Sequence, residues 1–160
     1  MEPIRVGMAE YKVASNPAAL TSIGLGSCIG IVLYDAFNKL GALAHVMLPR
    51  ESEAKDKSNP AKFADTAIEL ILEEMEKRGS LKRNIKAKIF GGANMFPSVQ
   101  SVTLLNVGER NAQAVKEELE KRKIKLVAED LGGNSGRTIY FDIQDGSVRV
   151  RTIRGEERVY

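Results

Sequence analysis

Two apolar segments joined by a short polar stretch constrain the fold of this chain most strongly. Residues 29–34 read Ile-Gly-Ile-Val-Leu-Tyr, residues 40–48 are again mostly apolar, and the turn-like stretch between them runs from Asp35 to Lys39. Apolar, β-branched runs bounded by turn residues predict strands, so we expect a β-hairpin. Residues equally far from the turn face each other in an antiparallel pair. With the turn centred near Phe37, position 45 is expected opposite about position 29.

The hairpin carries the only cysteine and the only histidine of the chain. Cys28 directly precedes the first apolar segment, and His45 lies in the second. The predicted register places the two side chains within reach, although a slip of one residue would turn every side chain to the other face. A thiol nucleophile needs a base that accepts its proton. The pair therefore predicts cysteine-based acyl chemistry.

The residues before the cysteine favour this interpretation over a structural one. Taken alone, a free cysteine is most often a small buried hydrophobe, and a lone histidine is most often a hydrogen-bonded core residue. Cys28 instead ends the run Gly24-Leu25-Gly26-Ser27-Cys28. The glycines permit a tight turn that presents successive amides, which suits an oxyanion and would also favour a thiolate. The N–H groups of Ser27 and Cys28, beside Gly26, are the expected donors.

The remaining chain predicts two helices and further strands. Asn59-Pro60 is typical of a helix start, the apolar stripe of the first helix follows from residue 64 to 75, and Gly79 ends it. A second helix is expected near Asn106, which resembles a capping box with Glu109. Strands are expected at 84–90, 124–130, 137–143 and 147–153, with Asp145-Gly146 as the final hairpin turn. Two helices with roughly eight strands, mostly in hairpins, define an α+β fold.

Composition limits the class of protein. A length of 160 residues with 43% hydrophobic residues suits one domain over residues 1–160. One cysteine, no cationic leader and no bilayer-length apolar stretch predict a soluble cytoplasmic protein without membrane insertion. The net charge is only +3, and lysines alternate with glutamates through 73–86 and 116–125, so we expect no nucleic-acid partner.

The arginines near the end of the chain and the small number of metal-binding residues also bear on function. Arg149, Arg151 and Arg154 are expected on the exposed face of an edge strand, where charge discourages aggregation. One cysteine and one histidine supply too few soft ligands for a structural zinc, so we expect no metal site and no cofactor. A redox sensor based on Cys28 would lack a second cysteine within the chain to resolve a sulfenic acid.

Several motifs, in order along nearly the whole chain, resemble the CheD family of chemoreceptor glutamine deamidases. They are the Gly24–Cys28 run, Ala44–Pro49, Lys62–Ala67, Lys88–Ala93, Gly108–Asn111, and Asp130–Asn134 with Arg137.

The resemblance implies a catalytic role for three residues. Cys28 would be the nucleophile, His45 the general base, and a hydroxyl residue upstream of the glycines would complete the site. The family usually has threonine there, whereas this chain has Ser22, with Thr21 directly before it. Adjacent side chains in an extended segment point to opposite faces, so only one of the two can face His45, and the spacing favours Ser22.

The resemblance also implies a fold and partners. It implies sheets layered between helices in a sandwich related to the fold of a glutamine-deamidating toxin. The implied substrate is a glutamine on the cytoplasmic helices of a methyl-accepting chemoreceptor, and the implied second partner is a CheC-type phosphatase. Glutamate methylesterase activity could accompany deamidation. The alternative function is a regulatory binding protein for CheC or the receptor, in which turnover is secondary.

Overall fold

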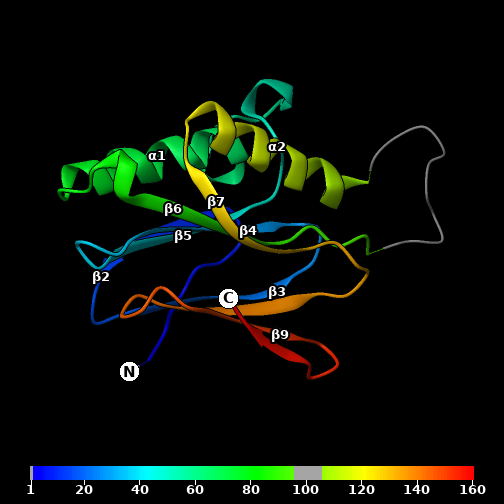
Figure 1. Ribbon diagram of the computed structural model, residues 1–160. Helices are drawn as coiled ribbons and strands as arrows, with labels where there is room; N and C mark the ends of the chain where they lie inside the picture. Colours follow the sequence, from blue (N-terminus) through cyan, green and yellow to red (C-terminus); the bar gives the residue numbers. More distant parts are fainter. Residues whose placement is uncertain (1, 96–105) are drawn as a thin grey trace.

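A computed structural model of the protein describes residues 2–95 and 106–160 (Figure 1). The first five strands are β1 (Ile4–Arg5), β2 (Glu10–Ser15), β3 (Ala19–Leu25), β4 (Ile29–Asp35) and β5 (Leu40–Val46). The other five are β6 (Ile85–Gly91), β7 (Lys125–Leu131), β8 (Arg137–Asp142), β9 (Val148–Thr152) and β10 (Glu157–Val159). The helices are α1 (Ala64–Lys77) and α2 (Val107–Lys121), with short 3-10 turns η1 (Glu51–Glu53), η2 (Pro60–Lys62) and η3 (Lys82–Asn84).

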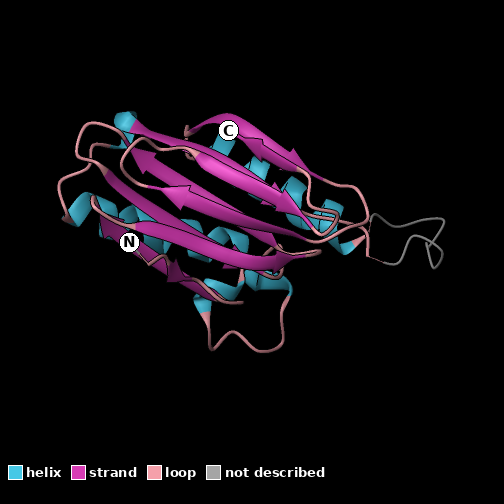
Figure 2. Cartoon of the chain, turned by 90° about the horizontal axis from the view of Figure 1, so that it is seen from below, coloured by secondary structure: helices cyan, strands magenta, loops and turns pink. Residues whose placement is uncertain are grey.

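The strands form two stacked five-stranded sheets, and the two helices lie on one of them. The central sheet has the order β2-β5-β4-β6-β7, and the outer sheet has the order β1-β3-β8-β9-β10. Both α1 and α2 cover the face of the central sheet that points away from the outer sheet (Figure 1). The view in Figure 2 shows the other face of the outer sheet, with no described helix in front of it. The layer order is therefore helices, central sheet, outer sheet.

The central sheet is buried on both faces, which explains the unbroken apolar runs of the hairpin. Every residue of β5 is buried, as is every residue of β4 except Tyr34. Ile29, Ile31 and Leu33 pack toward the helices, whereas Val32 packs toward the outer sheet. A strand between two apolar layers needs apolar side chains at every position.

The helices begin and end where the sequence pattern indicates, with one difference. The Asn106 side chain accepts the amide of Glu109 at 2.9 Å, which confirms the predicted cap of α2. The Asn59 side chain caps the 3-10 turn η2 instead, and α1 begins at Ala64. Gly79 follows α1 with φ of 103°, a conformation that favours glycine.

The α+β class is confirmed, while three details of the prediction are wrong. Both described helices lie on one side, so the sheets do not lie between helices. The strand β9 is not an edge strand, because β10 pairs antiparallel with it beyond the turn of Gly155. Asp145-Gly146 consequently turns the penultimate hairpin, not the last one. The sequence of β10, Glu-Arg-Val, has no apolar alternation that would have revealed it.

Candidate functional site

The hairpin register brings Cys28 and His45 to one face of the central sheet. His45 lies opposite Gly30, one residue further along than predicted. Gly30 and Cys28 are two positions apart, so they share a face, and that face carries His45. The predicted partner, Ile29, points toward the helices. Cys28 packs at the edge of the apolar layer between the two sheets.

The loop of Cys28 is held by its carbonyl groups, which leaves its amides available. The carbonyl oxygen of Gly26 accepts the Ala93 amide at 2.9 Å, and that of Cys28 accepts the Gly92 amide at 3.0 Å. The carbonyl of Ser27 accepts the side-chain amide of Asn111 at 2.9 Å. Within residues 2–95 and 106–160, no described hydrogen bond uses the N–H of Gly26, Ser27 or Cys28. A loop that faces inward with its carbonyls can offer these amides to an anion.

Glycines from distant motifs allow the chain to close around this loop. Gly91 has φ of 113°, and a Cβ at this position would lie 2.2 Å from the Cys28 carbonyl oxygen. Gly108, in the first turn of α2, would place a Cβ 2.5 Å from the carbonyl oxygens of Gly92 and Ala93. The amide of Gly132 donates to the Gly91 carbonyl at 2.9 Å. The motifs of Gly91, Gly108 and Gly132 therefore pack together beside the loop of Cys28.

Asn111 connects the cysteine loop to the histidine strand. Its side chain is fully buried, and its amide nitrogen donates to the Ser27 carbonyl at 2.9 Å and to the Met47 carbonyl at 3.0 Å. Ser27 precedes Cys28, and Met47 follows His45 by two residues. Nothing in the sequence shows that α2 packs on this loop, so the sequence alone does not reveal this role of Asn111.

We expect Asn111→Asp to lower both activity and stability. A carboxylate cannot donate to either carbonyl, so the loop and the strand lose their shared anchor, and misplacing reacting groups by about 1 Å costs about a hundredfold in rate. Burying the unpaired charge destabilises the fold by about 3 kcal/mol. Steady-state kinetics and urea unfolding measure both effects. Gln113→Glu, the same amide-to-acid change on the exposed face of α2, should alter neither by much; equal behaviour of the two variants would refute the anchoring role.

His45 is buried, and its ring is positioned by a backbone carbonyl. The Nδ1 atom lies 3.4 Å from the carbonyl oxygen of Val6, which can accept a hydrogen bond from a protonated Nδ1. That tautomer leaves Nε2 as the nitrogen able to accept a proton. Val6 lies between β1 and β2, in a segment whose amide at Ala9 donates to the His45 carbonyl at 2.9 Å. Sequence reasoning missed Val6, because a backbone carbonyl leaves no residue-type signal.

The two hydroxyl residues have different positions. Ser22 pairs with Ile139 on the face of the outer sheet that looks toward the central sheet, and its hydroxyl donates to the Val6 carbonyl at 2.7 Å. The hydroxyl of Thr21 donates to the Ile139 carbonyl at 2.6 Å. Ser22 and His45 thus meet at one carbonyl oxygen. No described hydrogen bond joins either hydroxyl directly to the imidazole.

Burial disfavours the charged form of both candidate catalytic groups. Burial raises the pKa of the Cys28 thiol above its ordinary value of 9.0. Burial also lowers the pKa of His45 below 6.5, against smaller opposing effects of the Val6 carbonyl and the Glu10 carboxylate. Burial thus works against the thiolate that the glycine loop was expected to favour. The arrangement suits a neutral imidazole that takes the thiol proton during attack.

Met95 lies beside the cysteine loop. Its side chain is 42% exposed, and its Cγ and Sδ atoms would lie 3.3 Å from a Cβ at Gly26. The sequence left exposure and burial of Met95 and Phe96 equally open; Met95 is exposed, and Phe96 lies outside the described residues. Among the described residues no cluster of metal-binding side chains occurs, and no helix is long and apolar enough to cross a membrane.

Fold and site together define an α+β protein with a lone thiol and a lone imidazole on one face of a sheet. A model of the CheD family, described as CheD chemotactic sensory transduction, matches residues 47–152. A protein of Syntrophomonas wolfei named probable chemoreceptor glutamine deamidase CheD is 52% identical over 98% of this chain and 97% of its own length. A protein with the same name from Clostridium novyi is 49% identical over 95% of this chain and 94% of its own length. Another from Thermococcus kodakarensis is 46% identical over 94% of this chain and 92% of its own length. The chain belongs to the CheD family.

Among solved structures, the crystal structure of the hypothetical protein YfiH of Bacillus licheniformis overlaps 75% of this chain and 49% of its own, with a TM-score of 0.48 and 14% identity. A likeness of this degree carries no argument about fold or function.

Proposed function

We propose that this protein is a chemoreceptor glutamine deamidase that uses Cys28 as its nucleophile and His45 as its general base. The names of its CheD relatives support the activity. The observation that carries the residue assignment is the shared face of Cys28 and His45 beside a loop whose amides make no hydrogen bond to the described residues. The proposed domain comprises residues 1–160, acts in the cytoplasm, and needs no cofactor.

The first half of the proposed reaction forms a thioester. His45 accepts the thiol proton of Cys28 as the sulfur attacks the side-chain carboxamide carbon of a substrate glutamine. The amides of Ser27 and Cys28, with that of Gly26 nearby, stabilise the developing oxyanion. His45 then returns the proton to the leaving nitrogen, the carbon–nitrogen bond breaks, and ammonia departs.

The second half regenerates the enzyme. His45 accepts a proton from water as the water oxygen attacks the thioester carbon, and the carbon–sulfur bond breaks to release glutamate and the Cys28 thiol. Ser22 and the Val6 carbonyl hold the imidazole in the tautomer that this cycle needs. A glutamate methyl ester can enter the same cycle, with methanol as the leaving group.

Incubation of the wild-type protein with the cytoplasmic fragment of a chemoreceptor tests this function. We expect particular receptor glutamines to become glutamate, with ammonia released in equal amount. Peptide mass spectrometry detects the conversion and locates the glutamines. Absence of conversion by a folded protein that binds the fragment would contradict the proposal. That result would favour the alternative function, a regulatory binding protein for the receptor or for a CheC-type phosphatase. This alternative ranks second because both Cys28 and His45 are present in the chain.

The proposed mechanism predicts the pH dependence of turnover. Protonation disables His45 as a base, so kcat/KM should fall on acidification with a midpoint below 6.5, because burial lowers this pKa. The alkaline change should lie above 9.0, because burial raises the pKa of Cys28. The unfolded chain binds the His45 proton more readily than the native state, so native stability also falls as the pH drops below 6.5. An acid midpoint above 6.5 would contradict a buried, neutral imidazole, and a loss of activity below pH 9.0 on the alkaline side would instead indicate a thiolate–imidazolium pair.

A further inference from the structure

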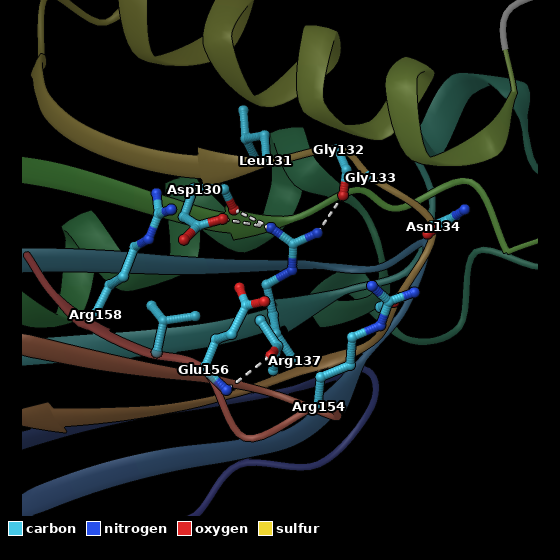
Figure 3. Close-up of a pocket in the computed structure, with 12 residues that line it drawn as sticks. Asp130, Leu131, Gly132, Gly133, Asn134, Arg137, Arg154, Glu156 and Arg158 are labelled. Atoms are coloured by element: carbon cyan, nitrogen blue, oxygen red, sulfur yellow. Dashed lines mark hydrogen bonds and ion pairs between the residues drawn. The ribbon is translucent and has the colours of Figure 1, made fainter.

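A pocket of about 280 Å³ lies at the end of the outer sheet, where β7 ends and the β9–β10 turn begins (Figure 3). Three arginines and two carboxylates line it: Arg137, Arg154, Arg158, Asp130 and Glu156. In Figure 3, Arg154 and Arg158 lie on either side of the central Arg137. The remaining walls include residues 131–135. The pocket is therefore polar, with one more cationic than anionic side chain in its lining.

The carboxylate of Asp130 is already occupied, which leaves the cationic charge unbalanced. One of its oxygens accepts Arg137 Nη1 at 2.6 Å, and the other accepts the Tyr160 hydroxyl at 2.5 Å. This bond raises the pKa of Tyr160, and the neighbouring Arg158 lowers it. Within the described part of the chain, neither Arg154 nor Arg158 makes an ion pair. Two guanidinium groups thus face the pocket against the single remaining carboxylate, Glu156.

Arg137 supplies an independent sign of a missing partner. Its side chain is only 7% exposed, and its Nη atoms are bound by Asp130 and by the Gly132 carbonyl. Its Nε is buried and has no hydrogen-bond acceptor among the described residues. Buried donors in native proteins almost always find an acceptor in protein, water or ligand. An anion in the pocket would balance the charge around this group.

The pocket shares a wall with the loop of Cys28. Arg137 pairs with Leu25 in the β3–β8 ladder, three residues before the cysteine. The carbonyl of Gly133 accepts the Asn94 amide at 2.8 Å, and the Gly132 amide donates to the Gly91 carbonyl. The next residue, Gly92, donates its amide to the Cys28 carbonyl. The segment that lines the pocket therefore also supports the cysteine loop from the other side. The pocket and the cysteine loop are therefore neighbours that share this wall of backbone.

We propose that this arginine pocket is an exosite that binds a carboxylate side chain of the same protein substrate whose glutamine enters the Cys28 site. The inference rests on the proposed function. Guanidinium groups bind carboxylates through paired N–H donors, and such contacts across an interface set orientation and register. Because deamidation itself creates carboxylates, a substrate surface with several modifiable glutamines gains ligands for this pocket as the reaction proceeds.

The double variant Arg154→Gln with Arg158→Gln tests the exosite. We expect KM for a chemoreceptor cytoplasmic fragment to rise about tenfold, with kcat at saturation changed much less, because the lost contacts act in binding. The dependence of KM on salt should also weaken. The matched control is Arg149→Gln with Arg151→Gln, which removes the same charge from the neighbouring strand, where both arginines pair with Glu157 at 3.1 Å. An equal KM change in both double variants, or none in either, would overturn the proposal.

A binding measurement separates this proposal from the proposed function. The same substitutions are placed in the Cys28→Ala protein, and the dissociation constant for the receptor fragment is measured without turnover. If the wild-type protein converts no glutamine, the deamidase assignment fails, and about tenfold weaker binding by the Arg154 and Arg158 variant alone would still support the pocket. Unchanged binding alongside normal conversion would refute the exosite and leave the deamidase intact.

Discussion

Replacing Cys28 with Ala is expected to lower glutamine conversion by at least about a thousandfold. No other thiol exists in the chain to replace it as nucleophile. Binding of the receptor fragment should persist, since the change removes one small, half-buried sulfur and leaves the loop's backbone bonds in place. The rate of ammonia release and the dissociation constant, measured side by side, separate loss of chemistry from loss of fold.

The neighbouring residue provides the matched control. Ser27 contributes to the proposed site only through its backbone, because its carbonyl accepts the side-chain amide of Asn111 and its N–H is one of the proposed oxyanion donors. Ser27→Ala keeps both groups and should retain turnover within about threefold. Conversion by Cys28→Ala at the wild-type rate would eliminate the thioester mechanism, and loss of activity in Ser27→Ala would show that a hydroxyl is needed at this loop.

Gly91→Ala should destabilise the protein far more than Gly79→Ala does. A methyl group at Gly91 would lie 2.2 Å from the Cys28 carbonyl oxygen, and the residue would also keep an unfavourable φ of 113°. The neighbouring strand cannot retreat, because β4 is paired on both sides, with β5 and with β6. We expect a loss of at least about 4 kcal/mol in the free energy of unfolding, with activity lost in the protein that remains folded.

Gly79→Ala isolates the steric part of this effect. Gly79 has a similar φ of 103° but no heavy atom within 4 Å of its Cβ position. The backbone strain alone should cost about 1–3 kcal/mol in urea unfolding and leave kcat unchanged. A Gly91 variant as stable as the Gly79 variant would mean that the close approach to the Cys28 loop is not needed.

The chemistry-bearing residues could be predicted from the sequence because their signals are local. The apolar runs on either side of a five-residue turn predicted the strand register of the Cys28 and His45 hairpin to within one residue. That error of one residue decides on which face of the sheet each side chain lies. The two-residue periodicity of strands made the prediction sensitive to the position of the turn centre, which Asp35 sets by accepting the amides of Phe37 and Asn38.

The supporting contacts could not be predicted, because they join distant segments or use backbone atoms. Asn111 binds Ser27 and Met47 across 84 and 64 residues, and nothing in its own helix indicates that role. The Val6 carbonyl has no side-chain signature. Arg154 follows the alternating arginines of β9, yet it lies in a turn and lines a pocket, because the strand ends two residues earlier at Thr152.

The most direct test of the central claim is a search for the covalent intermediate on Cys28. Enzyme in excess over receptor fragment is quenched in acid during a single turnover, digested, and examined by mass spectrometry. The account predicts a transient species in which the Cys28 peptide carries a receptor peptide less one ammonia, formed before glutamate and lost as glutamate accumulates. Glutamate that accumulates while Cys28 stays unmodified at every time point would contradict it.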